Sequence, residues 1–414
     1  MNTPVLRIAR AVVMTVVCSA GLVGGSESAA AQQVPIGPGC PALYLLGVQG
    51  TGQSSPTANP TADTGVIGAL LGPVLAAVPT LVQRSYIAYD AGFGGAVPGG
   101  GADPYATSVA SARTGLDAAA TQVVAACPGT MLAAVGYSQG AQAVAEFARS
   151  VGSGNGPVPP DRIAGIALYS DPTRSSGAPV FPGRPGQVVP DPAPGSNGTA
   201  VAGVQLASSA SAGGGIADED AGYGALTGRV ADICVDGDLA CSAPDHAAVL
   251  RVGAELAAQA DLRDPIAAIG SIQSLLSAAL GNAWTTVVLN DFHVQGSDVD
   301  YTPARTLAQR LTDAADPRIP SPTTEDVSAA ATQWNAITAA TASNPAGVLP
   351  KLAGQLSAAW GQLVADNSDL VNPAVLIRFA DTVARHNGYA ISGQMNSGIA
   401  WFIALAHDIA GSRP

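Results

Sequence analysis

The sequence has a single lysine, Lys351, and little charge of either sign. Charged residues make up 12% of its 414 residues, and 30 acidic against 18 basic side chains give a formal net charge of −12. Proteins that bind nucleic acid carry basic stripes or patches, and anionic lipid headgroups attract clusters of Lys and Arg. The composition therefore argues against nucleic acid as a partner and against simple attraction to anionic lipid surfaces.

Signatures of nucleotide binding are also missing. A glycine-rich loop at residues 47–52 follows the apolar run 42–46, but no Gly-Lys-Ser/Thr comes after it, so it is not a P-loop. It is not a convincing dinucleotide fingerprint either. Hydrophobic residues make up 47% of the chain, which is enough for a substantial core in one large domain or two smaller ones.

Cysteine is scarce, with five in the chain, of which Cys18 lies in the N-terminal segment. An even number of remaining cysteines in an exported protein suggests two disulfides, and the sequence alone allows three pairings. The short separation of Cys234 and Cys241 favours a bridge between them, which leaves Cys40 to pair with Cys127. Four cysteines so scattered do not suggest a metal site.

The N-terminal segment, residues 1–31, has the pattern of a secretory signal peptide. Two arginines precede an apolar run at 11–23, and three alanines at 29–31 provide a cleavage site near Ala31. The apolar run is too short to span a membrane comfortably. We therefore expect a mature chain that is secreted or held in the cell envelope and has no stable transmembrane segment.

The most informative stretch is residues 136–140, which read G-Y-S-Q-G around Ser138. An apolar run at 131–135 precedes it, and an Ala-rich helical stretch at 141–149 follows it. Strand, tight turn and helix form the context of a nucleophile elbow, which projects a serine from the edge of a sheet. The start of the following helix also offers free N–H groups to an oxyanion.

Strand-like and helical stretches alternate through the first part of the chain. The expected strands are 42–46, 81–89, 131–135, 163–169 and 229–234, and the expected helices are 65–78, 108–126 and 141–149. Such alternation predicts a parallel sheet with helices on both faces, which is an α/β fold. The Pro/Gly/Ser-rich run at 175–215 shows no periodicity and is expected to form a long surface loop.

Beyond Cys241 the pattern becomes mostly helical. Apolar residues recur at helical spacing in 247–259, 265–280, 304–315, 325–342 and 348–366. The main strand candidate there is 285–289, and three tryptophans are expected in the core, namely Trp284, Trp334 and Trp360. We predict a helical insertion at 242–372, followed by a C-terminal part at 373–414 that closes with an amphipathic helix around 399–405.

A serine hydroxyl becomes a good nucleophile only when a base takes its proton and a carboxylate orients that base. In α/β hydrolases the chain order is Ser, then Asp or Glu, then His. The candidate bases after Ser138 are His246, His293, His386 and His407. The candidate acids include Asp171, Asp236, Asp238, Asp245 and Asp291.

Together these features resemble the cutinase family. The resemblance rests on Cys40, the Gly50-Thr51 loop, Cys127 eleven residues before Ser138, the pentapeptide at 136–140, and the run C-V-D-G-D-L-A-C at 234–241. It covers residues 38–241 and 380–410. It implies an α/β-hydrolase fold with a cutinase-like central parallel sheet flanked by helices.

The resemblance also implies a catalytic triad. The family has C-x-x-G-D-x-x-C around its second disulfide, and the aspartate that acts as the acid carries over to Asp238, with Asp236 as a solvated neighbour. The family's histidine lies in H-x-x-Y before an A-x-F-type helix, and His386 matches with H-N-G-Y at 386–389. His246 stays open as an alternative base, because it is nearer to the family's usual spacing but lacks the following tyrosine.

One oxyanion-hole donor is the backbone N–H of Gln139, which follows the nucleophile. The resemblance implies that Thr51 supplies the other. Where the family commonly has A-R-G, residues 48–50 read V-Q-G, and Gln49 is expected to replace part of the lost bracing contact. The insertion at 242–372 is a second departure. We expect it to act as a cap over the cleft, and a side domain packed away from the site is the alternative.

The sequence therefore predicts an exported serine esterase that acts on hydrophobic or lipid-like esters through Ser138, His386 and Asp238 and requires no metal or cofactor. Its expected parts are a signal peptide at 1–31, a catalytic core at 32–241, a cap at 242–372 and the last part of the core at 373–414. Two alternatives stay open: a cell-envelope acyltransferase or lipid-remodelling enzyme with the same triad, and a non-catalytic surface binding protein. The sequence does not indicate the oligomeric state.

Overall fold

The computed structural model describes residues 32–412 except 207–210, 218 and 220, so the predicted signal peptide and its cleavage site lie outside the described residues. Five parallel strands form the central sheet in the order β2-β1-β3-β4-β5. They are β1 Leu43–Val48, β2 Val82–Tyr86, β3 Met131–Tyr137, β4 Ile163–Tyr169 and β5 Val230–Ile233. All five lie where the sequence predicts strands, and the α/β-hydrolase type of fold is confirmed.

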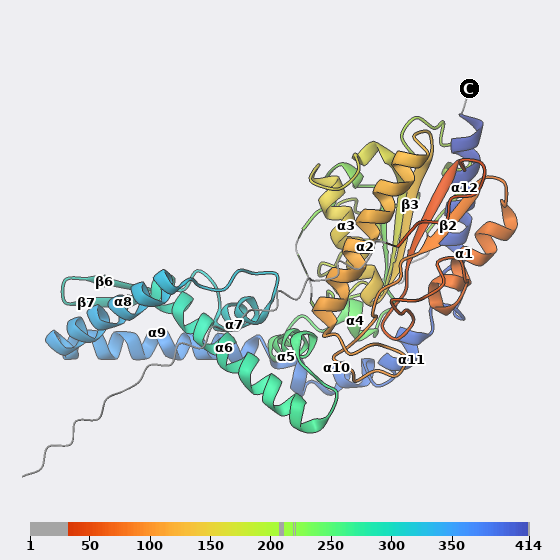
Figure 1. The fold of residues 1–414 in the computed structure, drawn as a ribbon. Helices are drawn as coiled ribbons and strands as arrows, with labels where there is room; N and C mark the ends of the chain where they lie inside the picture. Colours follow the sequence, from red (N-terminus) through yellow and green to blue (C-terminus); the bar gives the residue numbers. More distant parts are fainter. Residues whose placement is uncertain (1–31, 207–210, 218, 220, 413–414) are drawn as a thin grey trace, which may run out of the picture. The chain divides into compact units, whose positions relative to one another are not determined.

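Helices cover both faces of this sheet (Figure 1). One face carries α1 Gly65–Ala77 and α12 Asn396–Gly411, and the other carries α2 Tyr105–Ala126 and α3 Gln139–Gly152. In β1, Leu43 and Leu45 pack with the first pair of helices, whereas Tyr44 and Leu46 pack with the second. This division follows from the strand geometry, because successive side chains point to opposite faces.

The closing helix α12 is a core element. Trp401 and Phe402 are fully buried, and the Trp401 ring lies 6.3 Å from that of Phe181. The helix packs against α1 and β4. The predicted amphipathic helix is therefore confirmed, and its apolar side covers the sheet.

The two predicted disulfides are present. Cys40 pairs with Cys127, which links the start of β1 to the end of α2, and Cys234 pairs with Cys241. The second bridge closes the loop between β5 and the short helix α4 Leu239–Ser242. Both bridges therefore brace segments that run into or out of the central sheet.

The region after α4 is mainly helical, as predicted. Its helices are α5 Ala248–Gln259, α6 Pro265–Asp291, α7 Leu307–Ala315, α8 Thr324–Ser343 and α9 Pro345–Ala365. Val288, Ile337 and Val348 belong to a small hydrophobic core within it. Two short helices follow, α10 Pro373–Arg378 and α11 Thr382–Asn387. Single 3₁₀ turns lie at Pro160–Arg162, Val201–Gly203, Gly224–Leu226 and Ser368–Val371.

Two predictions for this region are wrong. The stretch 285–289 is not a strand but continues α6. Val287, Val288 and Leu289 pack into the small core as part of this helix, and this packing overrides the strand preference of the β-branched residues. The strands lie further on, in an antiparallel pair formed by β6 Phe292–Gln295 and β7 Asp298–Tyr301. The tryptophans are not core residues either: Trp284 and Trp334 contact each other but are partly exposed, and Trp360 is 64% exposed.

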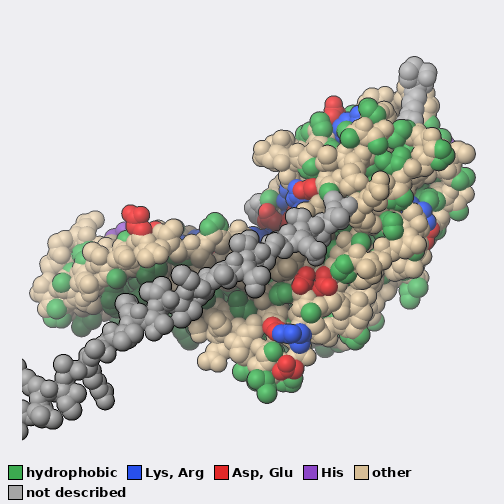
Figure 2. All heavy atoms as spheres, in the orientation of Figure 1, with side chains coloured by type: hydrophobic (Ala, Val, Ile, Leu, Met, Phe, Trp, Pro, Cys, Tyr) green, Lys and Arg blue, Asp and Glu red, His purple; other side chains and the backbone are tan. Residues whose placement is uncertain are grey.

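These helices carry more apolar surface than their small core covers. Hydrophobic side chains appear at the surface in Figure 2, and large ones exposed on α6 and α9 include Ile266, Ile269, Leu280 and Leu349. Among the described residues, α6 is the one helix long and apolar enough to cross a membrane, and it is mostly exposed. One such helix is weak evidence for a membrane span.

Candidate active site

Ser138 occupies a sharp turn between β3 and α3. Its backbone has φ = +54° and ψ = −121°, a conformation that is strained for a residue with a side chain. The Ser138 N–H donates a 2.9 Å hydrogen bond to the Tyr169 carbonyl at the end of β4. Glycine is required on both sides, because a Cβ on Gly136 would clash with the Gly140 carbonyl and a Cβ on Gly140 with the Val48 carbonyl. This is the geometry of a nucleophile elbow.

Asp238 lies in the loop that follows β5, and its side chain is completely buried. Oδ1 accepts a 3.1 Å hydrogen bond from the Ala240 N–H at the start of α4. Oδ2 accepts hydrogen bonds from the Ser170 hydroxyl at 2.6 Å and the Tyr389 hydroxyl at 3.0 Å. These donors replace the water that the carboxylate loses on burial.

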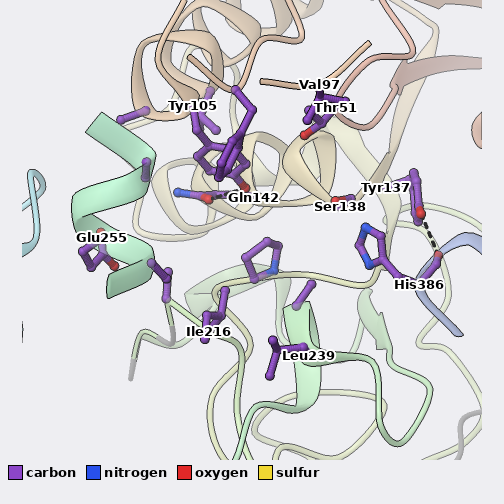
Figure 3. Close-up of a pocket in the computed structure, with 18 of the residues that line it drawn as sticks. Thr51, Val97, Tyr105, Tyr137, Ser138, Gln142, Ile216, Leu239, Glu255 and His386 are labelled. Carbon is purple, nitrogen blue, oxygen red and sulfur yellow. Dashed lines mark hydrogen bonds between the residues drawn. The ribbon is translucent and has the colours of Figure 1, made fainter. Parts of the chain in front are cut away.

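His386 lies near the end of α11, with Nδ1 3.0 Å from Asp238 Oδ1. Its backbone carbonyl accepts a 2.6 Å hydrogen bond from Tyr137, and the two rings lie 5.3 Å apart. Burial, and next the charge of Asp238, raise the pKa of Tyr137, so that its hydroxyl stays protonated and can donate. The imidazole points toward Ser138 (Figure 3). The structure thus brings Ser138, Asp238 and His386 together.

The other candidate bases lie elsewhere. His246, His293 and His407 are exposed, and none of them lines the cavity at Ser138. The backbone N–H of His246 donates to Asp369 Oδ2 at 3.0 Å.

The other candidate acids have different partners. Asp236 forms an ion pair with Arg378, Asp291 pairs with Arg310, and Asp245 accepts a hydrogen bond from Ser176. Asp171 is fully buried and accepts hydrogen bonds from Thr173. The partners named here are an arginine, a serine or a threonine, and not a histidine.

The expected oxyanion-hole residues stand at the same site. Thr51, just after β1, lines the cavity, and the Gln139 N–H is at the first turn of α3. Gln139 Nε2 donates a 2.9 Å hydrogen bond to the Gly92 carbonyl, which holds this buried side chain in place. Gln49 braces the Thr51 loop: its Oε1 accepts a 3.1 Å hydrogen bond from the N–H of Ile67 in α1.

The sequence reasoning missed Ser170 as a site residue. Its Oγ lies 2.9 Å from His386 Nδ1 and 2.6 Å from Asp238 Oδ2. A usable signal was present, since Ser170 directly follows the strand β4 and the carboxyl ends of neighbouring parallel strands meet at one edge of a sheet.

A cavity of about 690 Å³ opens at Ser138 and is lined largely by apolar side chains. In Figure 3, Ser138 and His386 lie on one side of it and Gln142 and Glu255 on the other. Burial raises the pKa of Glu146, another lining residue, although Gln142 donates a hydrogen bond to its carboxyl. The predicted insertion also contributes lining residues, which are Ala254, Glu255, Ala258, Pro317 and Arg318.

In the described ranges, no group of three or more His, Cys, Asp or Glu side chains could hold a metal ion. The polar groups that meet beside this cavity are the His386 imidazole, the Asp238 carboxylate and the hydroxyls of Ser170 and Tyr389. This set is suited to proton transfer from a serine hydroxyl.

The chain was compared with known proteins. The model of the family Cutinase matches residues 39–252, a range that contains Ser138, Asp238 and His246 and ends before His386. The carboxylesterase Culp6 homolog of Corynebacterium glutamicum is 32% identical over 130 residues, which cover 28% of this chain and 37% of that protein. The chain thus matches little more than a third of the length of this curated relative.

Three solved structures are also similar. The catalytic core of acetyl xylan esterase from Trichoderma reesei is 21% identical with a TM-score of 0.36, covering 57% of this chain and 99% of that one. Lysin B from Mycobacteriophage D29 is 19% identical with a TM-score of 0.32, covering 72% and 89%. A cutinase-like protein from Cryptococcus sp. is 18% identical with a TM-score of 0.32, covering 49% and 80%. These values are too low to support a function.

Proposed function

This chain belongs to the cutinase family, and we propose that it is an exported serine esterase that hydrolyses carboxylic esters of hydrophobic, lipid-like acids. The observation that carries the proposal is the convergence of Ser138, His386 and Asp238, from three distant parts of the chain, at one edge of the sheet. The two disulfides support export, because such bridges form and persist in oxidising compartments.

In the first half of the reaction, Ser138 Oγ attacks the ester carbonyl carbon while His386 Nε2 takes its proton. Asp238, which faces Nδ1, keeps the ring in the tautomer that leaves Nε2 free and stabilises the imidazolium that forms. The carbonyl oxygen becomes an oxyanion that accepts hydrogen bonds from the Gln139 N–H and from Thr51. The intermediate then collapses, the C–O bond to the alcohol breaks, and His386 returns the proton to the leaving alkoxide.

In the second half, a water molecule gives a proton to His386 and its oxygen attacks the carbonyl carbon of the acyl-enzyme. The bond to Ser138 Oγ breaks, the serine recovers the proton, and the carboxylic acid leaves. Every step uses the same base and the same oxyanion donors.

The lining of the cavity supports the proposed substrate class. Its walls include Phe93, Val97, Val109, Ile216 and Leu239, so that a hydrocarbon chain would lose contact with water on entry. α5 and the segment before Arg318 form part of the wall, which supports the cap hypothesis for this portion of the insertion.

Hydrolysis of a p-nitrophenyl ester series by the mature protein tests the proposal. The variants Ser138→Ala and His386→Ala are expected to lose several orders of magnitude in kcat/KM, and His246→Ala is expected to keep its activity. An inactive His246→Ala with an active His386→Ala would overturn the assignment of the base. Absence of reaction with an organophosphonate would overturn the proposed function itself.

A further inference from the structure

We propose that Ser170 is a positioning residue of this site, whose hydroxyl joins the Asp238 carboxylate and the His386 imidazole in one hydrogen-bonded array. The inference rests on the proposed function and adds a fourth residue to it. Ser170 does not touch the reacting atoms and acts through its two neighbours.

The sheet places Ser170 between the nucleophile and the acid. β4 is the strand between β3, which leads to Ser138, and β5, which leads to Asp238. The Ser138 N–H donates to the Tyr169 carbonyl at 2.9 Å, and the Ser170 N–H donates to the Ile233 carbonyl at 3.1 Å. Three consecutive strand ends are thus tied together by backbone hydrogen bonds, with the Ser170 side chain on the middle one.

The two contacts of the hydroxyl assign its proton. Ser170 Oγ donates its one hydrogen to Asp238 Oδ2, at 2.6 Å, so it can only accept from His386 Nδ1, at 2.9 Å. The Nδ1 proton is then shared between Ser170 Oγ and Asp238 Oδ1, which lies at 3.0 Å. Sharing keeps this proton on Nδ1 and leaves Nε2 unprotonated toward Ser138, as the reaction requires.

The backbone at Ser170 supports a role for the side chain. Its φ is +58°, in the left-handed region that glycine occupies at less cost, and the residue is fully buried. Strain of this kind persists only where the surroundings impose it, and it gathers at functional sites. Serine thus occupies a position whose backbone conformation favours glycine.

The test compares two variants that both remove the hydroxyl but change the backbone differently. Ser170→Gly relieves the strain at φ = +58°, whereas Ser170→Ala keeps the Cβ and the strain. Ser85→Ala is the matched control. Ser85 is as buried as Ser170, and its hydroxyl donates to the backbone carbonyl of Tyr86 in β2, the outer strand on the side of the sheet away from β5. For all three variants, kcat and KM are measured with p-nitrophenyl butyrate as a function of pH, and melting temperatures are measured by thermal unfolding.

Both Ser170 variants are expected to lose about tenfold to 100-fold in kcat, the range that a small misplacement of a catalytic group costs, with little change in KM. The acid limb of the kcat/KM profile is expected to move in both, because the lost hydroxyl contacts both the Asp238 carboxylate and the His386 imidazole. Their melting temperatures are expected to differ, with Ser170→Gly the higher. Ser85→Ala keeps the wild-type kcat and pH profile.

Activity of Ser170→Gly within about twofold of wild type, with an unmoved acid limb, would overturn the inference. A loss of kcat that parallels the loss of melting temperature across the variants would overturn it as well, because reduced stability alone would then explain the activity. NMR of protein labelled with ¹⁵N-histidine tests the hydrogen bonds of His386 Nδ1 in the absence of substrate. A changed chemical shift of the Nδ1 proton in both Ser170 variants supports the inference, and an unchanged shift overturns it. An inactive wild type that does not react with an organophosphonate would refute the proposed function separately.

Discussion

The hydroxyl of Tyr137 donates a 2.6 Å hydrogen bond to the backbone carbonyl of His386, which lies 249 residues further along the chain. Tyr137 directly precedes Ser138, so one side chain links the strand that carries the proposed nucleophile to the segment that carries the proposed base. This hydrogen bond therefore helps to hold Ser138 and His386 at a fixed distance from each other.

Tyr137→Phe removes this link and is expected to lower kcat/KM about fivefold, since a hydrogen bond contributes about 1 kcal/mol and the positioning of His386 depends on it. The wild-type link should persist into alkaline solution, because burial raises the pKa of Tyr137. Kinetics from pH 6 to 10 check both points. Equal kcat/KM for the two proteins throughout this range would show that the link does not position the histidine.

Removal of each of the two disulfides is expected to affect stability and activity to different extents. The bridges close loops with sequence separations of 87 and 7 residues, for which chain entropy predicts roughly 4.5 and 2.5 kcal/mol of stabilisation. Replacing Cys40 and Cys127 by serine should therefore lower the unfolding free energy more. Replacing Cys234 and Cys241 should lower kcat/KM more, because that bridge holds the Asp238 loop.

Urea unfolding and ester hydrolysis on the two double variants, at a temperature where both are folded, measure these effects. The interpretation of the short bridge as a brace for the acid fails if both variants lose the same fraction of kcat/KM.

The partly buried carboxyl of Glu146 should make stability depend on pH. Its pKa is raised in the folded protein, mainly by burial, so the favourable protonated form is present below the unfolded pKa and is lost as the pH rises through the folded value. Glu146→Gln has no charge to bury. Its melting temperature should exceed that of wild type at pH 8 and approach it at pH 4; a difference that is equal at both values would contradict this.

The part of the insertion that lines the cavity should select substrates by length. Ala258 of α5 faces the cavity, and Ala258→Trp is expected to reduce kcat/KM for long-chain p-nitrophenyl esters at least about tenfold more than for the butyrate, because the indole fills space that a longer chain needs. Val249→Trp, at a position of the same helix that is 58% exposed, is the control. An unchanged chain-length profile in Ala258→Trp would favour the side-domain alternative.

Much of the fold and part of the site could be predicted from local patterns in the sequence. The five strands follow from apolar runs in the sequence, and the elbow at Ser138 follows from Gly136 and Gly140, which leave room for the tight turn. The disulfide between Cys234 and Cys241 follows from a short separation in the chain. The stretch 285–289 was assigned wrongly because short β-branched runs have the same pattern in a strand and in a packed helix.

Only the tertiary structure decided which distant residues meet. His246 and His386 are both histidines after the acid, and the packing of α11 beside α4 places His386, and not His246, against Asp238. Ser170 lies in no motif, and nothing in the pentapeptide at 136–140 predicts the contact of its Tyr137 with His386. Both residues reach the site because parallel strands end side by side and turn their last residues toward one edge. Local sequence patterns determine whether a segment forms a strand, a turn or a helix. Which side chains come within hydrogen-bond distance, as Ser170, Asp238 and His386 do, depends on how segments far apart in the chain pack together.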